Sequence, residues 1–156
     1  MSDVYDPLGP LDIELKGKDF TPALIPEGSH PLQITAAELR PNKAGNNMNL
    51  YIKSTVINPT PTTVEGVVAE PGERNFETWD GVYTTEAMAN KGMDALDNIC
   101  STMDAIFNTS SEDRPNLNEE TINQMVGRQF VGLVKHQNDP QFGLQDRLVR
   151  YLPSAE

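Results

Sequence analysis

The chain has 156 residues, which is the usual size of one domain and enough to bury a hydrophobic core. Its mean hydropathy of -0.48 is typical of a soluble chain, and no apolar run approaches the ~20 residues that a membrane span requires. The net charge of -11 disfavours long-range attraction to nucleic acid, membrane surfaces and other polyanions, so a polyanion site would need a local cationic pattern.

The first 24 residues are rich in Pro, Gly and Asp and show no sustained period, which predicts an extended or loosely attached arm. Their opening, MSDVYDPLGPLDIELKGKDF, lacks the basic start and apolar stretch of a secretory signal. The single cysteine, Cys100, suits a reducing compartment. We therefore expect a cytoplasmic protein with an arm over 1–24 and one domain over 25–156.

Residues 25–58 predict a β-hairpin. Leu32, Ile34 and Ala36 recur at period two, which predicts a strand over roughly 31–39. After the turn RPNKAGNN, the segment MNLYIKSTVI alternates again. If its aliphatic set, Leu50, Ile52 and Val56, faces the core, then Tyr51, Lys53 and Thr55 share the other face, and Tyr51 and Lys53 point outward together.

The middle of the chain changes period. Residues 58–75 predict a long excursion with at most a short edge segment around Val67 and Val68, and FETWDGVY predicts a third strand. Residues 84–108 predict one helix, capped by Thr85, with an apolar stripe of Met88, Met93, Leu96, Ile99, Cys100, Met103 and Phe107. At this spacing a core-facing stripe is favoured over a partner groove.

The last part predicts a short helix and a second hairpin. The helix covers NEETINQMV and ends at Gly127. The strands RQFVGLVKH and DRLVRYL follow, separated by the turn residues of QNDPQFGLQ.

Five strands with one main helix between the third and fourth give the element order of an OB-fold, so we expect a mainly β (α+β), OB-fold-like five-stranded barrel. OB-folds bind oligonucleotides on strands two and three and on the loops joining strands one to two and four to five. Cations track phosphates there and aromatic rings stack on bases. The candidate nucleic-acid-binding residues at these places are Arg40, Lys43, Tyr51, Lys53, Phe76, Trp79, Arg128, Lys135, Phe142, Arg147 and Tyr151.

The segments that supply most of these residues are also the least acidic. Residues 25–58 and 128–156 each carry a net charge of +1, whereas residues 59–127 carry -10 and residues 1–24 carry -3. An acidic chain thus concentrates cations around the first turn and the last hairpin.

The stretch IPEGSHPLQITAAELRPNKAGNNMNLYIKSTVIN, with the helix KGMDALDNIC and the late strand GRQFVGLVKH, resembles a family of small phage-encoded proteins of unknown function. The resemblance covers roughly residues 25–152; Gly28, Lys43 and Gly45 match its opening pattern, and Gly127 starts the matching late strand. It implies single-stranded-DNA binding in phage replication or recombination, in the host cytoplasm. The chain ends in RYLPSAE and lacks the acidic Asp-Phe-Pro-Phe tail of well-studied bacterial single-stranded-DNA-binding proteins, which disfavours recruitment of host repair proteins through such a tail.

Each candidate also has a simpler interpretation. Phe76 and Trp79 could fill the core, and Lys53, Lys135 and Arg147 could be solvated strand faces that block edge pairing. Asp94, Asp97 and Asp104 suit the wet side of the helix and lack the partners of a metal site. His30, His136 and Cys100 form no expected catalytic dyad.

One fragment is enzyme-like. Asp12, Glu14 and Lys16 match the acid-x-Lys half of a metal-dependent nuclease, but only Asp3 and Asp6 precede them as further acids, in an arm without a strand signal. We therefore expect a non-enzymatic protein without cofactor or metal.

The sequence favours a single-stranded-DNA-binding protein of low sequence specificity. The alternative is an acidic protein-interaction module whose -10 segment docks to a replication, recombination or host-defence protein. Replication or recombination proteins are further partners under either interpretation, no membrane partner is expected, and homo-oligomerisation stays open.

Overall fold

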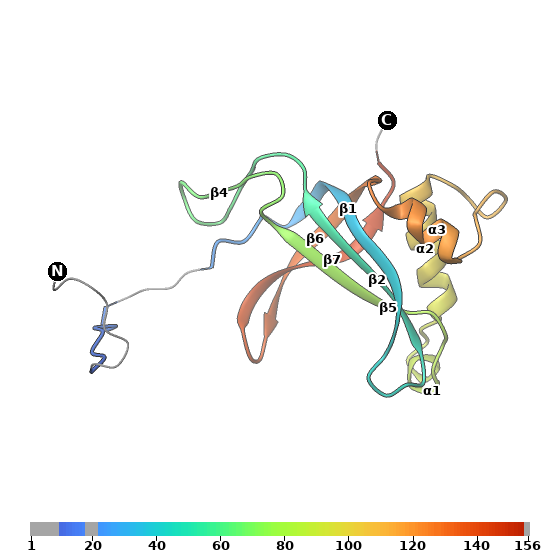
Figure 1. The fold of residues 1–156 in the computed structure, drawn as a ribbon, viewed down its shortest axis with the longest axis horizontal. Helices are drawn as coiled ribbons and strands as arrows, with labels where there is room; N and C mark the ends of the chain where they lie inside the picture. Colours follow the sequence, from blue (N-terminus) through green and yellow to red (C-terminus); the bar gives the residue numbers. More distant parts are fainter. Residues whose placement is uncertain (1–9, 18–21, 155–156) are drawn as a thin grey trace.

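The computed structural model describes residues 10–17 and 22–154, and its main feature is a five-stranded antiparallel sheet with the spatial order β5-β2-β1-β6-β7 (Figure 1). The expected mainly β class with five strands in the main sheet is therefore confirmed. These strands are β1 (Gly28–Pro41), β2 (Met48–Val56), β5 (Asn75–Gly81), β6 (Gln129–Asp139) and β7 (Gly143–Leu152). The fourth of them in chain order lies beside the first, as in a Greek key.

β1 and β2 form the expected hairpin, because the alternating aliphatic residues of both strands bury the same face. Leu32 pairs with Val56 and Ala37 with Ile52. Leu32, Ile52 and Val56 are almost fully buried and Ala37 packs against the core, whereas Leu39 at the end of the strand is 38% exposed. One extra residue, Thr35, interrupts the register of β1 as a β-bulge, which bends a strand. β1 can therefore pair with β6 through 28–33 and with β2 through 32–41.

The two edge strands, β5 and β7, are joined by side chains and not by a backbone ladder in the described chain. Thr78 Oγ1 lies 2.7 Å from Tyr151 OH, and Arg74, which directly precedes β5, forms an ion pair with Asp146 of β7. Because Arg74 precedes Thr78 and Asp146 precedes Tyr151, the two edges run in the same direction. The sheet is thus not closed into the barrel that the element order predicts.

The expected long helix is two helices, α1 (Glu86–Asn90) and α2 (Ala95–Phe107). Gly92 adopts a left-handed φ of 73° after α1, and the Asp94 side chain then accepts a hydrogen bond from the backbone N–H of Leu96 to cap α2. Thr85 caps α1 as expected. The helix break is visible in the sequence NKGMD, where a glycine stop precedes an N-cap aspartate.

Only part of the expected apolar stripe is buried, because the buried face of α2 runs through Ala95, Ile99, Thr102 and Ile106. Ile99 and Met103 enter the core and Phe107 packs against it. Met93 and Leu96 are 53% and 57% exposed, so their expected place in the core-facing stripe is wrong.

The third helix, α3 (Glu119–Met125), is the expected short helix before Gly127. Asn118 and Thr121 form a capping box at its start, and the Gly127 N–H donates to the Ile34 carbonyl at 2.8 Å. The three helices gather at one side of the sheet (Figure 1). None of the helices in the described residues is long and apolar enough to cross a membrane.

The excursion between β2 and β5 lies on the side of the molecule away from the helices (Figure 1). The short strands β3 (Thr60–Pro61) and β4 (Val68–Ala69) pair within the expected excursion. Ile25 is fully buried, and its N–H donates to Asp146 Oδ2 at 2.9 Å. Residues 10–17 of the arm contain a turn but no helix or strand, and Leu11, Ile13 and Leu15 are 64–72% exposed.

Candidate nucleic-acid interface

An aromatic and cationic cluster lies on the face of the sheet opposite the core. Trp79 of β5 pairs with Tyr51 of β2, and their ring centroids are 4.4 Å apart at an interplanar angle of 46°. The Arg40 guanidinium of β1 lies 4.2 Å from the Tyr51 ring centroid and 5.3 Å from that of Trp79. We call Arg40, Tyr51 and Trp79 the aromatic platform. Trp79 is 50% exposed, so part of its ring is accessible to a ligand.

Tyr51 lies on the expected face but is only 5% exposed, so its expected outward exposure is wrong. Arg40 and Trp79 cover its ring, and its hydroxyl donates to Glu77 Oε2. That hydrogen bond to the Glu77 carboxylate, together with burial, raises the pKa of the Tyr51 phenol. Tyr51 therefore supports Trp79 and does not itself offer a stacking surface.

Two lysines flank the platform. Lys43 is exposed in the β1–β2 turn, and Lys53 pairs across the strands with Glu77 on one side and Ala36 on the other. Within the described residues, neither lysine has a carboxylate within 4.0 Å, whereas Arg40 forms an ion pair with Glu38. The charges of Lys43 and Lys53 are thus available to an anion.

The turn that carries Lys43 is held in place by asparagine side chains. Asn42 Oδ1 accepts from the N–H groups of Asn46 and Asn47, and Gly45 adopts a left-handed φ of 74°. Asn47 is buried and donates from Nδ2 to the Tyr83 carbonyl at 2.8 Å. The turn is therefore anchored to the loop that follows β5, the strand that carries Trp79.

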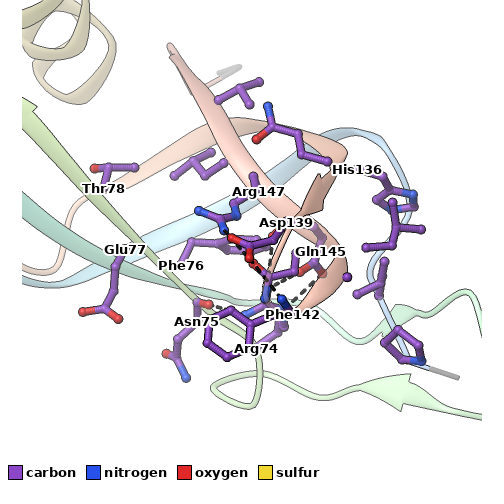
Figure 2. A pocket seen from close by; sticks show the side chains of 18 of the residues that line it. Arg74, Asn75, Phe76, Glu77, Thr78, His136, Asp139, Phe142, Gln145 and Arg147 are labelled. Carbon is purple, nitrogen blue, oxygen red and sulfur yellow. Dashed lines mark hydrogen bonds and ion pairs between the residues drawn. The ribbon is translucent and has the colours of Figure 1, made fainter. Parts of the chain in front are cut away.

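A groove of about 1330 Å³ lies beside the platform, between β5 and the β6–β7 hairpin (Figure 2). Four of its lining side chains are exposed and apolar: Trp79, Phe142, Leu144 and Val149. Figure 2 shows Arg147, Asp139 and Gln145 converging in it. Arg147 donates to Asp139 Oδ2 at 3.1 Å and to Gln145 Oε1 at 2.6 Å.

The groove also contains the buried ion pair between Arg74 and Asp146. Burial alone would raise the pKa of the Asp146 carboxyl, but hydrogen bonds from Arg74 and from the Ile25 N–H outweigh it and lower that pKa. The other charged residues that line the groove are Arg147, Glu77, Asp80 and Asp139. With Arg74 and Asp146 included, acids outnumber arginines in the lining by four to two. The groove itself is not a cationic channel.

Several of the expected site residues lie together on the groove or beside it. The structure brings Trp79, Phe142 and Arg147 together on the groove and Arg40 beside Trp79, with Lys43 and Lys53 on the neighbouring turn and strand. Lys135 pairs directly with Arg147 across β6 and β7. Two like charges opposite each other repel unless an anion or a carboxylate compensates them, and Asp139 is the carboxylate bonded to Arg147.

Three expected residues lie elsewhere or in the core. Phe76 is 4% and Tyr151 is 6% exposed, so these two rings are core residues and not open stacking groups. Tyr151 stacks on Phe130, with centroids 4.4 Å apart. Arg128 lies over the Phe107 ring of α2 at 4.5 Å and is absent from the groove lining.

Arg74 and Asp146 are structurally important residues that sequence reasoning missed. Arg74 lies in the expected irregular excursion, and Asp146 is the first residue of the expected last strand. Their partnership spans 72 positions and depends on how the sheet edges meet, so no local signal could have identified it.

The enzyme-like fragment gains no organised site. Asp12, Glu14 and Lys16 lie in the exposed segment 10–17, and Asp3 and Asp6 fall outside the described residues. No group of three His, Cys, Asp or Glu side chains within 10–17 and 22–154 could hold a metal ion.

Models of known protein families do not match this chain, and no curated protein shows significant similarity to it.

Proposed function

We propose that this chain binds single-stranded DNA with little sequence preference, and that Trp79 is its principal stacking residue. The half-exposed Trp79 ring, backed by Tyr51 and by the Arg40 guanidinium, is the observation that carries the proposal. An aromatic ring accessible to solvent and flanked by cations is what an unpaired base and its phosphates require.

The topology supports an OB-fold-like assignment. The main sheet has the strand order fourth, first, second, third for its first four strands, and a helical segment separates the third from the fourth. OB-folds are partly open Greek-key barrels that bind nucleic acid on strands two and three, which correspond here to β2 and β5. Tyr51 and Trp79 of the platform lie on those two strands, and Arg40 lies on the neighbouring β1.

The charge pattern supports weak, stacking-dominated binding. Lys43 and Lys53 can contact phosphates, while the acids of the groove and the net charge of -11 oppose the approach of a polyanion. Duplex DNA hides its base faces from Trp79, so single strands should bind more tightly than duplex.

The test is fluorescence anisotropy with labelled oligo-dT and with the matching duplex, each at several salt concentrations. We expect binding to oligo-dT that weakens with salt and weaker binding to duplex. Equal or stronger binding to duplex would reject the proposal. The phage-family resemblance of residues 25–152 supports a role in phage DNA replication or recombination.

A second candidate function is docking of a basic protein on the helical side. Met93 and Leu96 are exposed beside Asp94 and Asp97, which are exposed acids of the same segment, and this combination suits a partner with basic and apolar side chains. If oligo-dT fails to bind even at low salt, this function moves ahead. Cross-linked partners from a cell extract should then be lost in a Met93→Ser/Leu96→Ser variant and kept in a Trp79→Ser variant.

A further inference from the structure

The groove between β5 and the β6–β7 hairpin combines apolar and acidic side chains (Figure 2). Exposed apolar side chains that gather in one hollow with polar groups around them are typical of an interaction site. The groove volume of about 1330 Å³ exceeds the ~300–1,000 Å³ that is usual for small-molecule sites, so it suits a segment of a polymer. Four apolar side chains of its lining are 42–67% exposed: Trp79, Phe142, Leu144 and Val149.

One end of the groove is formed by a turn that the protein holds in place by itself. Asp139 Oδ1 accepts hydrogen bonds from the backbone N–H groups of Gln141 at 2.8 Å and Phe142 at 3.0 Å. The other oxygen of the same carboxylate bonds to Arg147. The turn therefore presents the Phe142 ring, which is 67% exposed, and a ligand does not have to order this backbone when it binds.

The groove has an excess of negative charge that the chain does not compensate. Asp139 and Asp146 each form an ion pair with an arginine of the lining. The two remaining acids of the lining, Glu77 and Asp80, have no cationic side chain within 4.0 Å in the part of the chain that the structure describes. Two carboxyl groups of the groove are thus open to a cation.

The environment of Asp80 favours a cationic ligand over an anionic one. Burial raises the pKa of the Asp80 carboxyl, because the carboxylate loses hydration there, and a cation beside it would offset this loss. Phosphates of a nucleic acid would be repelled by the same acids. A second copy of the chain carries a net charge of -11 and is disfavoured for the same reason.

We propose that the groove binds a segment of a partner protein in which Lys or Arg side chains stand among apolar ones. The apolar side chains of the segment cover Trp79 and Phe142, and its cations reach Glu77 and Asp80. This surface differs from the helical side, because none of the groove lining belongs to α1, α2 or α3. Trp79 also belongs to the aromatic platform, so the segment and an oligonucleotide compete for that ring, a consequence that rests on the proposed function.

The test is selection of a random library of short peptides on the immobilised full chain, followed by titration of the selected peptides. Peptides without tryptophan are used, because Trp79 is the single tryptophan of the chain and its emission then reports on binding. We expect the selected peptides to combine Lys or Arg with apolar residues, to shift Trp79 emission to the blue and to protect Trp79 from acrylamide. Their affinity should fall as salt rises.

Two variants separate the acidic and the apolar parts of the groove. Glu77→Gln/Asp80→Asn should weaken peptide binding about tenfold, because it removes both carboxylates that are open to a cation. Glu65→Gln/Glu112→Gln is the matched control, because it removes the same charge from exposed acids outside the groove lining, and it should leave binding unchanged. Phe142→Ser should weaken binding without any change of charge.

Equal losses in the two double variants would reduce the effect to general charge attraction and overturn the proposal. A library that yields no enriched peptides, or only acidic or purely apolar ones, would overturn it as well. Peptides that bind Phe142→Ser normally and are lost in Met93→Ser/Leu96→Ser would move the site to the helical side. None of these readouts needs DNA, so a failure here leaves the oligo-dT result to decide the proposed function by itself. If both hold, a selected peptide displaces oligo-dT.

Discussion

Trp79 lies directly across from Tyr51 in the pairing of β5 with β2, yet only Trp79 is open to solvent. The two rings therefore have different parts in the proposed interface. Trp79 supplies the surface on which a base stacks. Tyr51, held by its hydrogen bond to Glu77, packs against the Trp79 ring and fixes its position.

This division predicts unequal effects of substitution on DNA binding. Trp79→Ala should weaken oligo-dT binding by about 1 to 3 kcal/mol, because it removes the stacking surface. Tyr51→Phe should weaken binding less, because the ring that supports Trp79 remains and only its hydrogen bond to Glu77 is lost. Anisotropy titrations at one salt concentration measure both, with Tyr83→Ala as the control for an exposed aromatic residue outside the platform. A loss in Tyr83→Ala equal to that in Trp79→Ala would contradict the assignment.

Loss of the lysine charges and loss of the Trp79 ring should also change the salt dependence of oligo-dT binding differently. Replacing Lys43 and Lys53 by Ala should reduce the slope of log affinity against log salt by about 0.7 for each phosphate that the protein no longer neutralises. Trp79→Ala should weaken binding with nearly the same slope, because stacking releases no counterion. The same titrations at four or more salt concentrations give the slopes. An unchanged slope in the double lysine variant would remove the β1–β2 turn from the interface.

The sequence predicts the hairpin of β1 and β2 because its alternation is local: Leu50 and Ile52 are buried and Lys53 is on the other face, as expected. It does not predict that Tyr51 is covered, because Arg40 and Trp79 come from two other strands whose register is set by tertiary pairing. The burial of Tyr151 has the same origin, since its partner Thr78 lies 73 positions away. Local signals therefore identify strands and faces, while exposure within a face depends on neighbours that only the fold supplies.

The Arg74–Asp146 pair predicts a dependence of stability on pH. Because the folded-state pKa of Asp146 is lowered, its contribution to the free energy of unfolding is present above the ordinary aspartate pKa of about 4 and is lost as pH falls through the lower folded value. Asp146→Asn should cost about 2 kcal/mol at pH 7, because it removes the charged partner of Arg74, whose side chain is 32% exposed and keeps part of its hydration, and the difference from wild type should shrink toward pH 3.

Urea unfolding at pH 7, 5 and 3 measures this difference. Asp139→Asn is the matched control, because Asp139 forms an ion pair with the more exposed Arg147, and such surface pairs contribute about 1 kcal/mol or less. A constant difference between wild type and Asp146→Asn across this pH range would show that the Asp146 charge does not contribute as inferred.

The buried face of α2 predicts different behaviour for two of its apolar residues, Ile99 and Leu96. Ile99 is 4% exposed within the core, so Ile99→Ala should reduce the free energy of unfolding by about 2 to 5 kcal/mol through reduced burial and a cavity. Leu96 is 57% exposed, so Leu96→Ala should stay within about 0.5 kcal/mol of wild type. Urea unfolding at pH 7 compares the two proteins directly, and both variants carry the same new side chain within one helix. A cost for Leu96→Ala as large as that for Ile99→Ala would contradict the solvent-exposed position of Leu96 on α2.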